Sequence, residues 1–139
     1  MAEKIEVTVG DVLAPVVISD KNGTKVGAAF INTKDIRIPA RITEIIEYMK
    51  SLDVDGADYD SLLKFDKALE DKFCYLFGYD CRRSLFGVVS PTTPCGGKFA
   101  AVLILEKVME CLSDDIKKKA AQRTEKINQY VKPDRKSVV

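Results

Sequence analysis

An Asn-Gly pair at positions 22 and 23 constrains the fold most, because it lies between the arms "APVVIS" and "KVGAAFIN". Asn-Gly suits the two positive-φ positions of a type I′ turn, so apolar arms on either side of it predict a β-hairpin. Centring the turn on this pair sets three pairs of residues opposite one another: Ile18 and Gly27, Val16 and Ala29, and Pro15 and Phe30. Large side chains then face small ones, and Gly27 leaves room for another part of the molecule to approach closely.

After the hairpin the sequence changes to a helical period. The segment "IPARITEIIEYMKSL" carries an apolar stripe, and "YDSLLKFDKALEDKFCYLFG" carries a narrower one with spacings of three and four. Asp58 or Asp60 can cap the start of this second helix, and Gly78 follows its end as a C′ residue. Residues 79–98 are rich in glycine and proline and are predicted to be irregular. The apolar segment "KFAAVLILEKVMECL" predicts a third helix.

These patterns predict an α+β fold in one globular domain, which 139 residues are enough to form without metals or disulfides. We expect an N-terminal β-hairpin or small antiparallel sheet in residues 1–32 and a helical core in residues 33–112, giving a bundle of three to four helices. Residues 113–139 are expected to form a charged, projecting amphipathic helix and a tail. A lone hairpin is only marginally stable, so it must lie on the helices, on the preceding "KIEVTV" segment or on another subunit.

The sequence offers no pattern for catalysis or for a bound cofactor. It contains no histidine, which excludes Ser-His-Asp and Cys-His catalysis and every metal site that contains histidine. Its four cysteines include no Cys-x-x-Cys pair, the spacing typical of structural zinc sites. The segment "PCGGKF" lacks the Ser or Thr of a phosphate-binding loop, and "DVDGADYD" has its glycine at the wrong position for an EF-hand. We therefore predict a protein that is not an enzyme and that binds neither cofactor nor metal.

The charges are balanced, with 22 basic and 21 acidic side chains. A net charge of +1 argues against a protein built to bind nucleic acid or an anionic membrane. The longest apolar run is far shorter than the roughly 20 residues that span a bilayer. The N-terminal "MAEKIEVTVG" has no apolar signal core, so we expect a cytosolic protein.

The segment "FGYDCRRSLFG", residues 77–87, permits two interpretations. Two arginines beside Cys81 can lower the pKa of its thiol and form an anion site. Alternatively, Phe77 and Phe86 fold back onto the core while the arginines cap the carbonyl end of the preceding helix. The second interpretation is preferred, because no base or orienting partner accompanies the thiol.

The same region resembles small proteins encoded in the tail-assembly region of siphophages and prophages of Gram-positive bacteria. In that pattern a helix ends in Phe-Gly, and a Ser-x-x-Phe-Gly turn, a proline-bearing loop with a glycine pair and a final apolar helix follow. The matching pieces are Phe77-Gly78, Ser84-Leu85-Phe86-Gly87, Ser90-Pro91, Gly96-Gly97 and the helix from Phe99. Upstream, "AAFINTKD" resembles a strand that ends in Phe-Asn-Pro-Thr-Asp, here with Ile31 inserted and no proline. The chain departs from the pattern in lacking an aspartate before the Phe-Gly helix end and in its longer charged C-terminal helix.

The resemblance implies a non-enzymatic role in phage tail morphogenesis. The chain would be an assembly chaperone or accessory factor in the cytoplasm of the bacterial host, keeping the tape measure soluble until tail-tube subunits polymerise around it. Its partners would then be tape-measure and tail-tube proteins, or further copies of itself. Two alternatives remain open: a permanent structural subunit of the virion, in the tail or at the head-tail junction, and a small phage protein that binds and regulates a host protein.

Two features of the sequence predict where partners bind. An exposed hairpin edge can add a strand from a neighbour, and an amphipathic helix can lie along another helix. On the hairpin the expected contact residues are Val16, Ile18, Ala29 and Phe30; on the C-terminal helix they are Ile116, Ala120, Ile127 and Tyr130.

Overall fold

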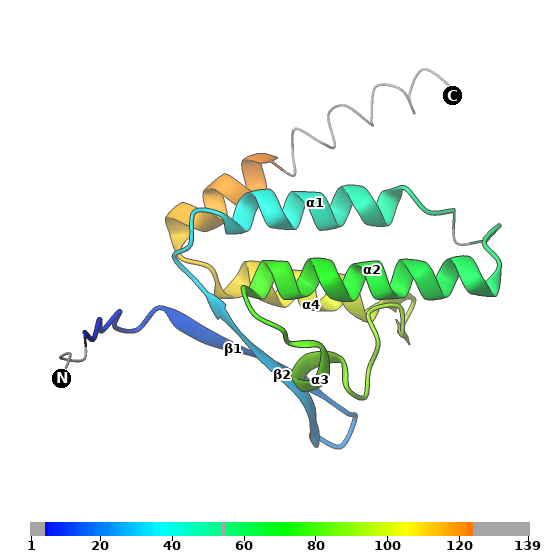
Figure 1. Cartoon of the computed structure of the whole chain (residues 1–139), viewed down its shortest axis with the longest axis horizontal. Coiled ribbons are helices and arrows are strands. Elements are labelled where there is room, and N and C mark those ends of the chain that lie inside the picture. Colours follow the sequence, from blue (N-terminus) through cyan, green and yellow to red (C-terminus); the bar gives the residue numbers. More distant parts are fainter. Residues whose placement is uncertain (1–4, 54, 124–139) are drawn as a thin grey trace.

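The computed structural model describes residues 5–53 and 55–123, and it has the predicted α+β fold: an N-terminal antiparallel hairpin followed by helices (Figure 1). The elements are β1 (Leu13–Ser19), β2 (Lys25–Asn32), α1 (Ile38–Lys50), α2 (Tyr59–Phe77), α3 (Arg82–Phe86), β3 (Pro94–Cys95), β4 (Lys98–Phe99) and α4 (Ala100–Cys111). A further helical segment covers residues 114–123.

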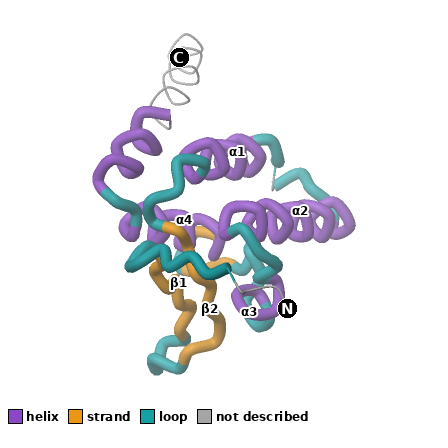
Figure 2. The backbone as a smooth tube through the Cα atoms, turned by 60° about the vertical axis from the view of Figure 1, so that its left-hand side comes forward, coloured by secondary structure: helices purple, strands orange, loops and turns teal. Residues whose placement is uncertain are grey.

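Helices α1 and α2 form one layer, α4 lies behind it, and the hairpin extends from the helices (Figure 1). Helices α1 and α2 run antiparallel side by side, and α4 lies behind α2 in Figure 1. Figure 2 shows the hairpin reaching away from the helices, with α3 beside β2. The core between these elements consists of aliphatic and aromatic side chains, and it includes the side chains of one face of the hairpin. The hairpin therefore does not stand alone, as the sequence required.

The hairpin has the predicted register but a different turn. Val16 pairs with Ala29, and the other two expected pairs also form. The predicted type I′ turn is wrong, because only Gly23 of the Asn-Gly pair has positive φ, at 82°. The Gly23 N–H donates to the Asp20 carbonyl at 3.0 Å, and the Asp20 carboxylate accepts the N–H of Thr24 at 2.9 Å. The result is a longer loop with a bulge after Ile18, held by the Asp20 side chain.

Helix α2 begins and ends where the sequence predicted. The Asp58 carboxylate accepts the N–H of Ser61 at 2.8 Å, so this residue, and not Asp60, is the N-cap. Gly78 ends the helix with φ of 87° and donates its N–H to the Cys74 carbonyl. The apolar seam that lies between these ends is buried, and it comprises Phe65, Leu69, Phe73 and Leu76.

Residues 79–98 are more ordered than predicted. They contain the five-residue helix α3 and the short β3–β4 hairpin. The turn of this hairpin is Gly96-Gly97, whose φ angles are 63° and 87°, values that favour glycine. Phe77, at the end of α2, and Phe86, at the end of α3, are buried, as the preferred interpretation of this region expected.

The start of the C-terminal helix packs on the body and does not project from it. Ile116 and Ala120 are buried, because this helical segment lies against the start of α1 (Figure 1). The Ser113 N–H donates to the Thr33 carbonyl at 2.9 Å, and Arg123 Nε donates to a hydroxyl of α1 at 3.2 Å. The prediction of a projecting helix is thus corrected for residues 114–123. Two expected contact residues, Ile127 and Tyr130, lie outside the described residues.

Candidate interaction surface

The face of the hairpin that points away from the helices is apolar and exposed. We call it the outer face; its residues are Leu13, Pro15, Val17, Val26, Ala28 and Phe30. Leu13, Phe30 and Val17 expose 56, 54 and 44% of their surfaces. Pro15 lies opposite Phe30 and Val17 opposite Ala28, so these side chains form two adjacent cross-strand pairs. Contiguous apolar side chains on a solvent-facing sheet are typical of a protein-binding surface.

The opposite face of the hairpin is held rigidly by close packing against α3. Gly27 has no side chain, and a Cβ there would overlap the main-chain carbonyl oxygen of Leu85 in α3. This is the close approach that the glycine predicted. At the edge of β2, the Tyr79 hydroxyl accepts the N–H of Phe30 at 3.0 Å. The outer face is therefore presented by a hairpin fixed on its other side and along one edge.

The contact residues predicted on the hairpin divide between its two faces. Val16 and Ala29 are buried in the core, and Ile18 is half-buried against it, so these three pack the hairpin onto the helices. Only Phe30 lies on the outer face. The prediction for the C-terminal helix is corrected in the same way, because its buried residues Ile116 and Ala120 are core residues. Both strands are apolar on both faces, and hydrophobic alternation alone could not tell which face is covered.

Leu13 and Val17 are the contact candidates that sequence reasoning missed. They alternate with Val16 and Ile18 along the same strand. Shifting the assignment of inward and outward positions by one residue therefore exchanges the exposed set for the buried one. The signal that could have decided it is Gly27. A glycine in a strand marks the face that another backbone approaches, and the residues paired around it must therefore face inward.

An apolar groove runs between β1 and α4 and has a volume of about 340 Å³. Val17, Ile18 and Ser19 form one wall, and Leu103 and Ile104 form part of the other. Among the residues that line the groove, Lys107 carries the only formal charge. The groove thus extends an apolar surface from the hairpin edge to the helices.

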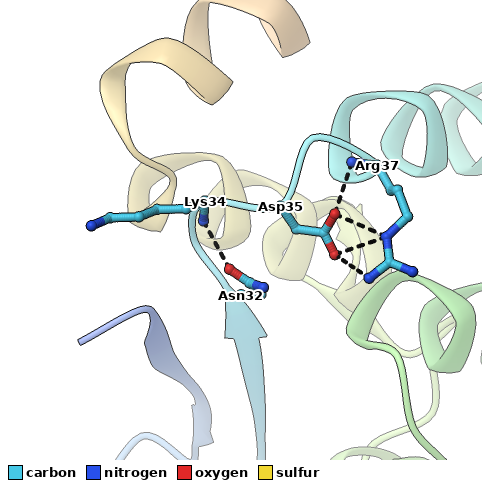
Figure 3. Close-up of polar contacts among 4 residues, drawn as sticks. All are labelled: Asn32, Lys34, Asp35 and Arg37. Atoms are coloured by element: carbon cyan, nitrogen blue, oxygen red, sulfur yellow. Dashed lines mark hydrogen bonds and ion pairs between the residues drawn. The ribbon is translucent and has the colours of Figure 1, made fainter. Parts of the chain in front are cut away.

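The link from β2 to α1 is fixed by two side chains that bond to the backbone nearby (Figure 3). The Asn32 side-chain oxygen accepts the Lys34 N–H at 3.0 Å, and the Asp35 carboxylate accepts the Arg37 N–H at 2.9 Å. Arg37 also donates from Nε and one terminal nitrogen to both carboxylate oxygens of Asp35. These bonds from Arg37 hold the pKa of the Asp35 carboxyl below its usual value. The contacts hold the link between the hairpin and α1.

A second cavity, of about 570 Å³, lies where α1 begins and α2 ends. It is lined by Arg37, Arg41, Cys74, Tyr75, Gly78, Tyr79, Asp80 and Arg82. Arg37 is paired with Asp35, and Arg82 with Asp71. The Arg41 guanidinium lies 4.2 Å from the centre of a tyrosine ring. An anionic ligand there would have to compete with the carboxylates that already pair with Arg37 and Arg82.

The thiol beside these arginines is buried. Cys81 has no exposed surface, and burial, reinforced by the Cys74 thiol 3.6 Å away, raises the pKa of its thiol to about 12. A reactive thiolate needs a depressed pKa and access to solvent, and Cys81 has neither. Arg82 pairs with Asp71 and its N–H donates to Asp80, so it does not cap the carbonyl end of α2 as predicted.

We expect iodoacetamide to leave Cys81 unmodified in the native protein. The reagent needs an accessible thiolate, and this thiol is buried and remains protonated at pH 8. Peptide mass spectrometry after labelling with and without denaturant measures the effect, and the three partly exposed cysteines serve as internal controls. Native labelling of Cys81 at the rate of Cys95 would contradict the burial described above.

Comparison of the chain with protein-family models, with curated proteins and with solved structures found no match. Within residues 5–53 and 55–123, no helix is long and apolar enough to cross a membrane. The same residues hold no group of three or more His, Cys, Asp or Glu side chains placed to share a metal ion.

Proposed function

We propose that this chain is a non-enzymatic assembly factor that binds other proteins through the outer face of its hairpin. The observation that carries the proposal is the exposure of Leu13, Val17 and Phe30 on a hairpin fixed from behind. Burying such a surface in a complex is favourable by roughly 25 cal/mol per Å² of apolar area. A preformed and rigid surface loses little conformational freedom on binding, which favours association further.

The proposed setting is phage tail assembly in a bacterial cytoplasm, with tape-measure or tail-tube proteins as the partners. Its support is the resemblance of residues 26–112 to small proteins of siphophage tail regions. The matching pieces have structural roles: Phe77-Gly78 ends α2, Ser84–Gly87 ends α3, and Gly96-Gly97 turns the β3–β4 hairpin. These pieces hold α3 behind β2, so they support the hairpin and leave its outer face available.

The experiment is a tagged pull-down from the native host during phage production, with mass spectrometry of bound proteins and of purified particles. We expect tape-measure or tail-tube proteins in the eluate and none of this chain in finished virions. The double variant Val17→Asp/Phe30→Asp should lose these partners, because it places two charges in the outer face. The matched control is Leu63→Asp, an equally exposed apolar position on α2, which should keep them.

Each other outcome identifies a different function. Stoichiometric presence of the chain in virions would replace the chaperone with a permanent structural subunit. Recovery of a host protein alone would indicate a regulator of the host and would overturn the phage assembly role. Equal recovery of tail proteins by the wild type and the double variant would show that the outer face is not the binding surface.

A further inference from the structure

The segment that precedes β1 has a strand pattern but is not a strand in the described structure. In residues 5–9, "IEVTV", apolar and polar side chains alternate, yet these residues belong to neither of the two sheets of the described residues. Ile5, Val7 and Val9 expose 92, 82 and 64% of their surfaces. Three consecutive apolar positions of an alternating segment are rarely left in water without a partner.

The edge of β1 that faces away from β2 has no strand paired with it in the described residues. Within the described residues, the sheet that contains β1 consists of β1 and β2 alone. The Phe30 N–H points away from β1, to Tyr79, so Pro15 and Phe30 form a non-hydrogen-bonded pair. Two residues further on, Val17 belongs to the same class, so its N–H and carbonyl point out of the free edge of β1, whereas Pro15 offers this edge a carbonyl alone. The apolar groove described above begins at this edge.

We propose that residues 5–9 of one copy pair with the free edge of β1 in a second copy and place Ile5, Val7 and Val9 in its groove. The two copies would each donate and accept one strand, forming a closed two-fold dimer with three-stranded sheets. Five residues of strand span about 17 Å, which fits beside the seven residues of β1. The groove supplies an apolar wall from Leu103 and Ile104 for the incoming side chains.

Residues 5–9 run away from the β1 of their own chain, so the strand that pairs with β1 would come from a second copy. Gly10 has φ of 75°, and the Val12 carbonyl is held by the Thr33 N–H at 2.8 Å and the Thr33 hydroxyl at 2.9 Å. The chain before this point runs outward from the body (Figure 1). In that course residues 5–9 lie away from their own β1 edge and are presented to a neighbour.

Light scattering coupled to size-exclusion chromatography of the full chain tests the proposal. At roughly 1 to 100 µM the wild type should elute with twice the chain mass of 15.4 kDa. Val7→Asp places a charge in the strand that is given, and Leu103→Asp places one in the groove that receives it. Each should raise the Kd of the dimer by at least about tenfold. An equimolar mixture of the two should recover some dimer, because one intact donor then meets one intact acceptor. The control Thr8→Asp changes the opposite side of the strand and should remain dimeric.

This result is separate from the partner binding proposed above, since Val7→Asp and Leu103→Asp change no residue of the outer face and should keep the tail proteins. Circular dichroism verifies that each variant is folded. A monomeric wild type over this range would overturn the proposal, as would a dimer that survives Val7→Asp. Absence of any mixed dimer from the Val7→Asp and Leu103→Asp pair would also overturn it.

Discussion

Replacing Phe73 with alanine should lower the free energy of unfolding by about 3–5 kcal/mol, the range for removing a buried aromatic ring. Phe73 has no exposed surface, and its ring meets that of Phe86 edge to face with centroids 5.5 Å apart. The ring lies where α2 and α3 meet. The cavity left by its removal would therefore weaken both the core and the packing of α3 on the hairpin. For a domain stable by about 5–15 kcal/mol, this loss is a large share of the total.

Urea denaturation followed by circular dichroism measures this effect, since the chain has no tryptophan to report on unfolding. The matched control is Leu63→Ala on the same helix, where the side chain is exposed and the expected change is within about 0.5 kcal/mol. Equal losses for the two variants would contradict the position of Phe73 at the centre of the core.

Replacing Gly27 with valine should lower the free energy of unfolding by at least about 1–3 kcal/mol, because the site has no space for a side chain. A Cβ at this position would overlap the carbonyl oxygen of Leu85, which is part of the main chain and cannot rotate away. The Leu85 N–H also donates to the main-chain carbonyl of Cys81 at 2.8 Å, which holds Leu85 in the turn of α3. Either α3 must move off the hairpin or β2 must bend.

The control for Gly27→Val is Ala28→Val, one residue along the same strand. Residue 28 lies on the outer face and is partly exposed, so the added methyl groups meet solvent, and the expected change is within about 0.5 kcal/mol. Thermal unfolding curves of the two variants give the comparison. If Gly27→Val unfolds at the wild-type temperature, the close packing of α3 on β2 is not required for stability.

The hairpin register was predictable because its signals are local. Centring the turn on Asn22-Gly23 predicted the register, and the pairs from Ile18 and Gly27 onward form as expected although the turn itself is of another type. The turn type was mispredicted although its signal was present. Asp20 three residues before Gly23 is the arrangement of a type I turn that ends in a left-handed glycine, and an Asn-Gly pair is compatible with this turn as well as with type I′.

The interaction surfaces could be predicted only in part, because they depend on contacts distant in sequence. The groove exists because β1 meets α4, some 80 residues further along the chain, and no local pattern encodes that meeting. Helix α3 is too short to show a period of its own, and its position rests on the gap left by Gly27. Burial of Ile116 depends in the same way on a helix folding back onto the start of α1.

The hydrogen bond from Phe30 to the Tyr79 hydroxyl has a consequence for the size of any assembly. A two-stranded sheet with two open edges can add strands on both sides, and repeated addition produces fibres. Here the tyrosine and α3 occupy the β2 side, which leaves β1 as the one side open to growth. With the β2 edge partly covered, a hairpin can pair edge to edge with a neighbour mainly through β1, so open-ended stacking of hairpins is disfavoured. The Tyr79 hydroxyl, which accepts the Phe30 N–H, is one of the contacts that restrict such growth.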